Sequence, residues 1–192
     1  MENAQKREEG NRMAANRRAA GRLSVCALMC ALLSVCAQIQ LPLPGVPLSL
    51  ALFAVHLCAL LLPPRQAVMS LCAYLLLGLC GVPVFAGFAC GPAALLGPTG
   101  GFLFAYPLSA LLSSTLAARL GRRFSSLFLC ALAGNALCMT LGVCWFLFVS
   151  GTPLTLPSLA YWLLYLPGDL IKIALACALA IRLYPQLKNL CI

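Results

Sequence analysis

The stretch Leu166-Pro167-Gly168-Asp169-Leu170-Ile171-Lys172 decides the interpretation of the chain, because it places two charges in an apolar C-terminal segment. Asp169 and Lys172 are three residues apart, so on a helix they share a face about one turn from each other. No other charged side chain lies within an apolar run. A charge in hydrocarbon costs at least about 2.5 to 3.5 kcal/mol, so the pair marks a candidate functional site. Mutual neutralisation, or extension of both side chains to an interface, is the structural alternative.

The composition identifies the class of protein. The 192 residues are 62% hydrophobic and 9% charged, whereas soluble domains carry about 25% charged residues. We therefore expect an all-α integral membrane protein with one membrane domain. The net charge of +9 does not indicate a nucleic-acid partner, because the basic residues follow membrane topology and no nucleic-acid-binding module is recognisable.

The apolar runs predict six transmembrane helices, at residues 23–38, 48–62, 66–80, 99–118, 124–149 and 160–183. We expect a basic cytoplasmic N-terminal arm over residues 1–22, a six-helix substrate-binding membrane domain over 23–185 and a short cytoplasmic tail over 186–192. The second and third runs are shorter than the roughly 20 residues that cross a bilayer upright. They are either short helices in a thinned membrane or a re-entrant pair.

Positive charge indicates the orientation of the chain. With a cytoplasmic N-terminus, six spans place 12 of the 13 Lys and Arg residues on the cytoplasmic side, which agrees with the positive-inside rule. Lys172 is the exception. Both termini are then cytoplasmic, and a pocket floored by the charged pair opens to the outer side. The loop over residues 81–98 carries no charge, and such a segment at membrane depth must pack on protein or line a cavity.

The segment Gly97-Pro98-Thr99-Gly100-Gly101-Phe102 begins the fourth predicted span. Its glycines allow a ligand to approach the backbone, and a helix N-terminus offers N–H groups to an anion or a carbonyl. Thr99, Gly100 and Gly101 are therefore candidate substrate-binding residues. A plain helix entry capped by Thr99 is the alternative. No Lys follows the glycines, so this is not a phosphate-binding P-loop.

Cysteine and histidine chemistry is not favoured by the sequence. The 12 cysteines are scattered through apolar runs without a C-x-x-C pair, and His56 is the single histidine. We expect packing roles for them, and neither a metal site nor a cofactor. An intramembrane enzyme is also disfavoured. Asp169 is the only acid outside the N-terminal arm, and Cys58 points elsewhere than His56 on a helix.

Three motifs together resemble the BioY family, the biotin-specific substrate-binding (S) components of energy-coupling factor (ECF) vitamin transporters. They are Val82-Pro83-Val84-Phe85-Ala86-Gly87, Gly97-Pro98-Thr99-Gly100-Gly101 and Gly168-Asp169-Leu170-Ile171-Lys172. The resemblance covers about residues 23–185. It implies six transmembrane helices in a prokaryotic plasma membrane, biotin bound from the outer side, and Asp169 and Lys172 as ligand contacts.

Two positions depart from the family pattern. The first loop reads Pro44-Gly45-Val46-Pro47-Leu48-Ser49-Leu50-Ala51 and lacks the family's glutamine, and Phe102 stands where a tyrosine is usual. Both changes remove polar groups available to a ligand. An S component for another vitamin is thus one alternative, and a structural membrane subunit that uses the charged pair for helix packing is another.

The pair suits the ureido ring of biotin. We expect Asp169 to accept from a ring N–H and Lys172 to donate to the ring carbonyl, in charge-assisted hydrogen bonds. The long stem of Lys172 also allows it to bind the valerate carboxylate instead.

Small residues in the first span offer a surface for close helix contact. Ala27 and Ala31 are four residues apart, and such faces let helices approach closely in lipid. The resemblance implies that this face docks the ECF transmembrane coupling subunit, which joins two ATPase subunits. Internal packing is the alternative for the two alanines. Because the chain has no nucleotide-binding motif, ATP enters only through partners.

Overall fold

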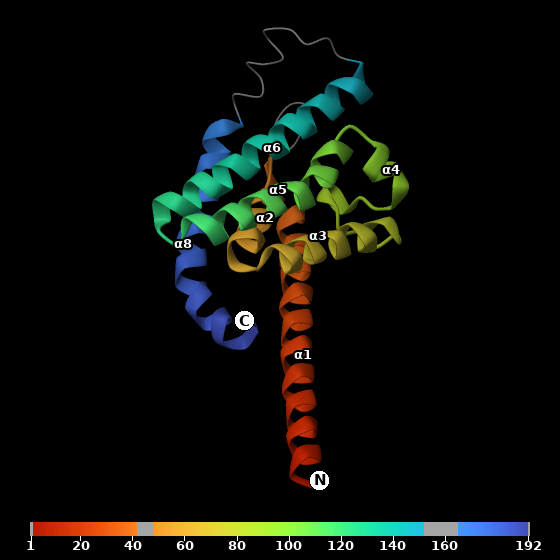
Figure 1. Ribbon diagram of the computed structural model, residues 1–192. Coiled ribbons are helices and arrows are strands. Elements are labelled where there is room, and N and C mark those ends of the chain that lie inside the picture. Colours follow the sequence, from red (N-terminus) through yellow and green to blue (C-terminus); the bar gives the residue numbers. More distant parts are fainter. Residues whose placement is uncertain (1, 42–47, 152–164, 192) are drawn as a thin grey trace.

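The structure of this chain is a computed structural model that describes residues 2–41, 48–151 and 165–191. The longer helices in it are α1 (Glu2–Gln38), α2 (Ala51–Leu61), α3 (Pro64–Leu79), α5 (Gly100–Leu120), α6 (Phe124–Ser150) and α8 (Leu166–Cys191) (Figure 1). Between α3 and α5 lie a short 3-10 turn, η1 (Ala86–Phe88), and the six-residue α4 (Gly91–Leu96). The predicted helical class is confirmed, apart from one small pair of strands.

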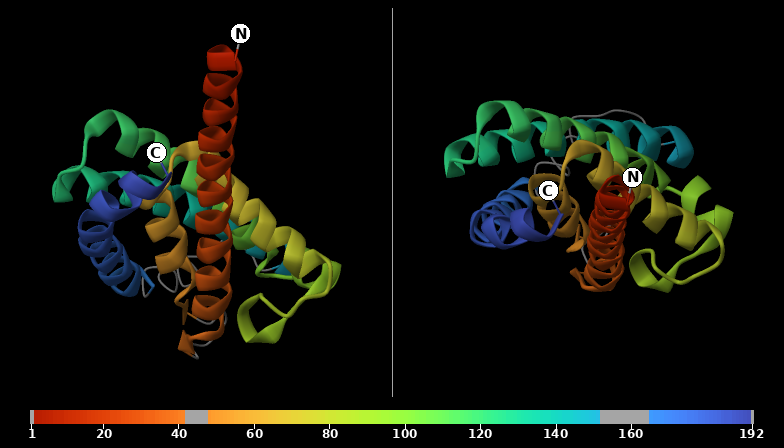
Figure 2. Two further views of the ribbon diagram at one scale, coloured as in Figure 1. Left: turned by 90° about the horizontal axis from the view of Figure 1, so that it is seen from below. Right: turned by 60° about the horizontal axis from the view of Figure 1, so that its bottom comes forward.

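Helix α1 passes without a break through the boundary that we expected between the N-terminal arm and the first span, at residue 22. It is 37 residues long, and its N-terminal part projects beyond the other helices (Figures 1 and 2). The boundary was drawn on polarity alone. Ala, Arg, Glu, Lys and Met are strong helix formers, so the polar residues continue the helix. At the other end of the chain, α8 likewise continues through the expected tail to Cys191.

The strands β1 (Gln40–Leu41) and β2 (Leu48–Ser49) form an antiparallel pair between α1 and α2. Gln40 pairs with Ser49, and the backbone N–H of Leu50 donates to Ile39 at 2.9 Å. The sequence assigned Leu48 to the second helix because of its apolar run, but α2 begins only at Ala51. The proline-rich part of this loop, residues 42–47, lies outside the described residues.

Arg122 joins three helices at one end of the bundle. It lies in the turn between α5 and α6, and its guanidinium donates to the backbone oxygen of Leu60 at the end of α2. The same group stacks over the ring of Tyr184 near the end of α8, 3.5 Å from the ring centroid. The C-terminal ends of α2, α5 and α8 therefore lie together at this end, beside the start of α6.

Two side-chain hydrogen bonds connect elements at the opposite end. Trp145, late in α6, donates from Nε1 to Gly97, just before α5, at 3.0 Å. Gln38, the last residue of α1, donates to the backbone oxygen of Phe85, beyond the end of α3, also at 3.0 Å. Helices α1, α3 and α6 thus run toward the end at which α5 begins. Helices α2 and α3 run in opposite directions, which two short crossing helices and a re-entrant pair have in common.

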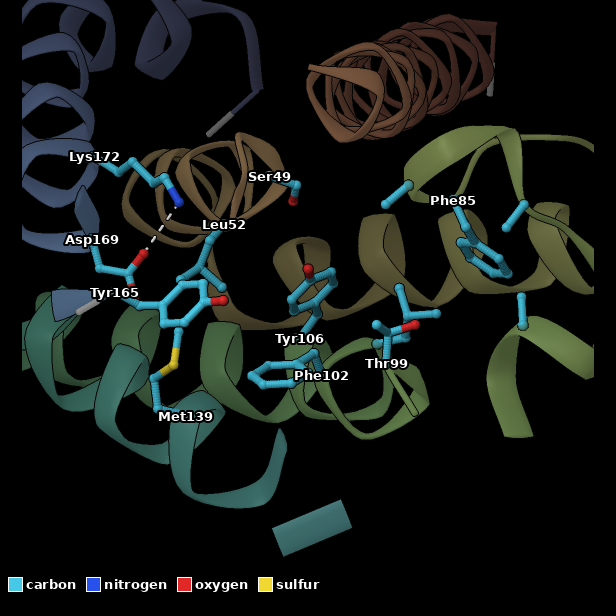
Figure 3. Close-up of a pocket in the computed structure, with 14 residues that line it drawn as sticks. Ser49, Leu52, Phe85, Thr99, Phe102, Tyr106, Met139, Tyr165, Asp169 and Lys172 are labelled. Carbon is cyan, nitrogen blue, oxygen red and sulfur yellow. Dashed lines mark hydrogen bonds and ion pairs between the residues drawn. The ribbon is translucent and has the colours of Figure 1, made fainter. Parts of the chain in front are cut away.

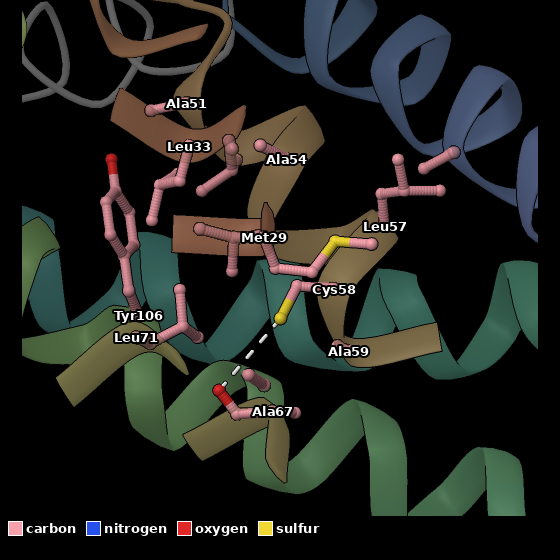
Figure 4. Packing of buried hydrophobic residues seen from close by; sticks show 14 of the residues in the cluster. Met29, Leu33, Ala51, Ala54, Leu57, Cys58, Ala59, Ala67, Leu71 and Tyr106 are labelled. Carbon is pink, nitrogen blue, oxygen red and sulfur yellow. Dashed lines mark hydrogen bonds between the residues drawn. The ribbon is translucent and has the colours of Figure 1, made fainter. Parts of the chain in front are cut away.

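Helix α2 forms the centre of the bundle (Figure 4). Ten of its 11 residues are buried, which is typical of a short helix that is apolar on every side. Met29 and Leu33 of α1 and Leu71 of α3 belong to the core cluster around it. Because α2 is surrounded by protein, the burial of any polar residue on it, such as His56, requires a partner inside the bundle.

Three helical segments are long and apolar enough to cross a membrane among the described residues: Ala19–Gln38, Gly100–Leu120 and Phe124–Ser150. Helix α2, with 11 residues, is a shorter apolar helix, and α3 has 16 residues. Together with the high hydrophobic content, these segments agree with an integral membrane protein. The predicted span over residues 160–183 falls partly on 160–164, which lie outside the described residues.

Candidate functional site

A cavity of about 770 Å³ lies where α2, α5 and α8 begin (Figure 3). This volume counts all the space between the lining side chains, including space that is open to solvent. The cavity is lined mainly by apolar and aromatic side chains, with a few polar groups: Ser49, Leu52, Phe85, Ala86, Ala89, Ala94, Thr99, Phe102, Leu103, Tyr106, Met139, Tyr165, Asp169 and Lys172. The predicted charged pair therefore lies in a concave site that combines apolar walls with convergent polar groups.

Asp169 and Lys172 occupy one end of this cavity, and Phe85 lies toward the other end (Figure 3). Lys172 Nζ donates to Asp169 Oδ1 at 3.1 Å. Asp169 is 1% exposed and Lys172 is 7% exposed. Helix α8 begins at Leu166, so Asp169 lies in its first turn and not some 13 Å along a span, as a start at residue 160 would have placed it.

A buried amide and a buried imidazole stand behind the ion pair. Asn135 of α6 is 2% exposed, and its side chain lies near the Asp169 carboxylate. Its Oδ1 lies 3.4 Å from His56 Nε2. A carboxylate only accepts, so Asn135 presents its NH₂ group to Asp169 and its oxygen to His56, which then donates from Nε2. Sequence reasoning missed Asn135, because an isolated Asn in an apolar run carries no motif.

Aromatic side chains form the wall beside the charged pair. Phe102 and Tyr106 project from α5, one turn apart, and Tyr165 precedes α8 (Figure 3). Tyr106 is 7% exposed, and its hydroxyl interacts with Ser49. The family's tyrosine is absent at Phe102, but Tyr106 brings a phenol to the same cavity from the next turn. Residues 102 and 106 are four apart, so helix α5 places both on one face.

The Val82–Gly87 turn supplies Phe85 to the cavity and is held by two side chains. Gln38 Nε2 donates to the Phe85 oxygen at 3.0 Å. Gln38 Oε1 accepts from the backbone N–H of Phe88, just after the turn, at 2.9 Å. Tyr74 donates to the backbone oxygen of Val84 at 3.1 Å and contacts the Phe85 ring edge-on, with centroids 5.4 Å apart. Gly87 has φ of 71°, a conformation that glycine adopts without strain.

Thr99, Gly100 and Gly101 have different surroundings. Thr99 lines the cavity and stands at the N-cap of α5, although its side chain makes no capping bond. Gly100 and Gly101 are buried and do not line the cavity. A Cβ added to Gly100 would collide with the backbone of Leu95, and one added to Gly101 with the Trp145 side chain. Their small size serves packing between the loop, α5 and α6.

Ala27 and Ala31 do not line this cavity. They lie on a different face of α1 from the core residues of that helix. Both alanines are exposed, as are Leu28 and Val35. Cys30 and Leu33 of the same helix are buried. Among the described residues, the two alanines therefore do not pack into the helix bundle. They belong to an apolar outer face of α1.

Metal-ligating side chains do not gather in the parts of the chain that the structure describes. No group of three or more His, Cys, Asp or Glu residues is placed to hold a metal ion there. The cysteines of the described residues are free thiols, of which Cys30, Cys36, Cys58, Cys130, Cys138 and Cys177 are buried. The cavity can instead bind a small ligand that has an apolar body and a head with both N–H donors and a carbonyl acceptor.

Comparisons with known proteins agree on one family. The BioY family profile matches residues 7–189. The biotin transporter BioY of Thermotoga maritima is 35% identical over 153 residues, which cover 80% of this chain and 89% of that protein. The probable biotin transporter BioY of Bacillus subtilis is 32% identical over 169 residues, which cover 86% and 90%. A match to the probable biotin transporter BioY of Pyrococcus horikoshii is 45% identical but spans only 56% of that protein.

A solved structure shares the fold. The crystal structure of the S-component for biotin from an ECF-type ABC transporter superposes with a TM-score of 0.81 and 29% sequence identity. The match covers 88% of this chain and 93% of that chain.

Proposed function

Because the chain belongs to the BioY family, we propose that it is an S component that binds biotin at the membrane and delivers it inward with an ECF energising module. It performs no chemical reaction on its ligand. The relatives named above are biotin transporters, and the matching crystal structure is of a biotin S-component. These similarities favour biotin over another vitamin and over a purely structural subunit.

The observation that carries the proposal is the ion pair of Asp169 and Lys172 at one end of a mainly apolar cavity. Biotin has the matching polarity. Its ureido ring presents N–H donors beside a carbonyl acceptor, and its thiophane ring and valerate chain are largely apolar. A site that pairs buried hydrogen-bonding groups with a ligand's polar head discriminates strongly against ligands that lack that head.

Each charged side chain has a definite role in this proposal. Asp169 accepts from a ring N–H, and Lys172 donates to the ring carbonyl. Both groups lie together at one end of the cavity, which supports their binding one compact ligand group. The alternative in which Lys172 binds the valerate carboxylate predicts a different response to ligand esterification, and this response distinguishes the two.

Other lining residues have supporting roles. Phe102, Tyr106 and Tyr165 contact the apolar rings. Thr99 contacts the ligand beside them, and Gly100 and Gly101 hold the entry of α5 in place by packing.

The proposed topology has six crossings of a prokaryotic plasma membrane, with both termini in the cytoplasm. The alternating directions of the six longer helices support an even number of crossings. Arg122 lies at the end of the bundle where α2 and α5 finish, and the positive-inside rule assigns that end to the cytoplasm. The cavity lies at the opposite end, where α2, α5 and α8 begin. Biotin then enters the cavity from the outer side.

We place the contact with the ECF transmembrane coupling subunit on the outer face of α1, at Ala27 and Ala31. Small exposed residues let a partner helix approach closely within lipid. Two ATPase subunits bound to the coupling subunit supply the energy, so this chain needs no nucleotide site. The transport step is then a reorientation of the loaded S component when the module acts on it.

Equilibrium binding of a panel of vitamins to the detergent-purified chain tests the function. We expect biotin to bind with at least about a hundredfold higher affinity than riboflavin, thiamine or folate, since none of these presents a ring carbonyl flanked by two N–H groups. Tighter binding of another vitamin would assign that ligand instead. No binding of any vitamin, by a protein that elutes as a folded species, would contradict the S-component proposal.

A further inference from the structure

A second hollow lies between α1 and the first turns of α3, apart from the ligand cavity. It is a groove of about 1,260 Å³ lined by residues from Ala19 to Cys26 on one side and from Pro63 to Met69 on the other. Figure 2 shows α1 passing beside α3. Nothing in the proposed uptake of biotin uses this groove.

Charge and apolar surface are ordered along the groove. Arg22 and Arg65 come first along their helices, and both are exposed. Cys26 and Met69 lie four residues further along α1 and α3, about one turn deeper. The membrane-compatible segment of α1 begins at Ala19. The two arginines thus lie near the boundary of the apolar segment, and the apolar side chains continue from them toward its middle.

The charge of the groove is of one sign. No acidic side chain lines it among the described residues, and the chain has only 4 acidic residues in all. Arginine binds phosphate through planar, bidentate hydrogen bonds. Gln66, in the first turn of α3, also lines the groove. Its side-chain oxygen Oε1 is buried and has no hydrogen-bond partner among the described residues.

We propose that this groove binds one anionic phospholipid of the phosphatidylglycerol type. The phosphate lies between Arg22 and Arg65, and an acyl chain lies over Leu23 and Met69. A free phosphate ion would leave the apolar part of the groove uncovered. An acidic peptide of a partner protein would meet the arginines but not fill that part. A phospholipid matches both features: its phosphate suits the two arginines near the boundary of the apolar segment, and its acyl chain suits the apolar side chains about one turn deeper.

Native mass spectrometry of the detergent-purified chain tests this site, with phosphatidylglycerol or phosphatidylcholine added in equal amounts. We expect wild type to retain one phosphatidylglycerol in preference to phosphatidylcholine. Arg22→Gln/Arg65→Gln should reduce that retention about tenfold. Arg119→Gln/Arg182→Gln is the matched control, because it removes the same charge at exposed positions outside the groove and should retain the lipid.

A third variant tests the apolar part of the groove. Met69→Trp keeps both arginines but fills the path of the acyl chain, so it should also reduce retention about tenfold. Soluble glycerophosphoglycerol, which lacks acyl chains, should not displace the bound lipid. The lipid site would be overturned if the control variant lost as much phosphatidylglycerol as Arg22→Gln/Arg65→Gln, or if the latter retained the lipid as wild type does. Displacement of the lipid by the soluble headgroup would also overturn it. Biotin binding by the variants shows that they remain folded.

Discussion

Lys172 Nζ lies 3.1 Å from Asp169 Oδ1, one turn away on helix α8, and both side chains are buried. A buried ion pair contributes little net stability, because desolvation of the two charges offsets their attraction. Removal of one partner is far more costly, since it leaves the other charge buried and unpaired. The effect of the pair on the free energy of unfolding can therefore be measured apart from its effect on ligand affinity.

The ligand-free protein should respond differently to single and paired substitutions. Asp169→Asn and Lys172→Met should each lower the free energy of unfolding by about 3 to 5 kcal/mol, because each leaves a buried charge without its partner. The double variant should lose clearly less than the sum of the two. Reversible unfolding in mixed detergent micelles measures these energies. Additive losses would show that the two charges are not coupled.

Esterification of biotin should separate the two roles open to Lys172. If Lys172 binds the ureido carbonyl, Lys172→Met weakens the binding of biotin and of biotin methyl ester by the same factor, about tenfold to a hundredfold for a charged hydrogen bond of about 1.5 to 3 kcal/mol. Isothermal titration with both ligands measures this. If only the free acid responds to the substitution, Lys172 binds the carboxylate instead.

Gly101 should tolerate no larger residue. A Cβ at this position would collide with Trp145, whose indole N–H bonds to Gly97 before α5. Gly101→Ala should lower the free energy of unfolding by about 1 to 3 kcal/mol through overpacking and weaken biotin binding. Gly10→Ala on α1 is the control, because nothing lies within 4 Å of its added Cβ. Equal stability of both variants would rule out this packing role.

Asn135 should position Asp169 for the ligand. Asn135→Leu leaves the N–H of the fully buried His56 without an acceptor, which costs about 1 to 3 kcal/mol of stability. It should also weaken biotin binding, because Asp169 loses a neighbour that orients it. His56→Leu combined with Asn135→Leu should recover stability but not affinity. Recovery of both properties would assign Asn135 a purely structural role.

The outer face of α1 should be needed for assembly but not for binding. Ala27→Trp and Ala31→Trp are expected to abolish co-purification with the coupling subunit and its ATPases, because bulk at exposed small residues keeps a partner helix away. Ala118→Trp, at an exposed alanine on α5, is the control. Biotin binding should be the same in all three. A complex that survives both α1 substitutions would place the docking face elsewhere.

The sequence was sufficient to predict the charged end of the cavity. Asp169 and Lys172 stand out because isolated charges in apolar runs are rare and costly. The span limits were also close where polarity changes sharply, as at Phe124, where α6 begins. Thr99 was recognised from the glycines that follow it, and it lines the cavity.

Contacts between distant segments were not predictable in this way. Asn135, Tyr106 and Met139 reach the site only through the packing of α5 and α6 against α2 and α8. Gly100 and Gly101 illustrate the reverse case. Glycine is required there for close packing of backbone and side chains, and sequence alone does not distinguish this need from close approach of a ligand.

The most direct test of the central claim is isothermal titration of biotin into purified wild type, Asp169→Asn and Arg182→Gln. Asp169 lines the cavity, whereas Arg182 is an exposed cation further along the same helix. We predict tight binding by wild type and Arg182→Gln. Asp169→Asn should bind about tenfold to a hundredfold more weakly, as expected for one charged hydrogen bond. Undiminished binding by a folded Asp169→Asn protein would contradict the assignment of this cavity end to the ureido ring.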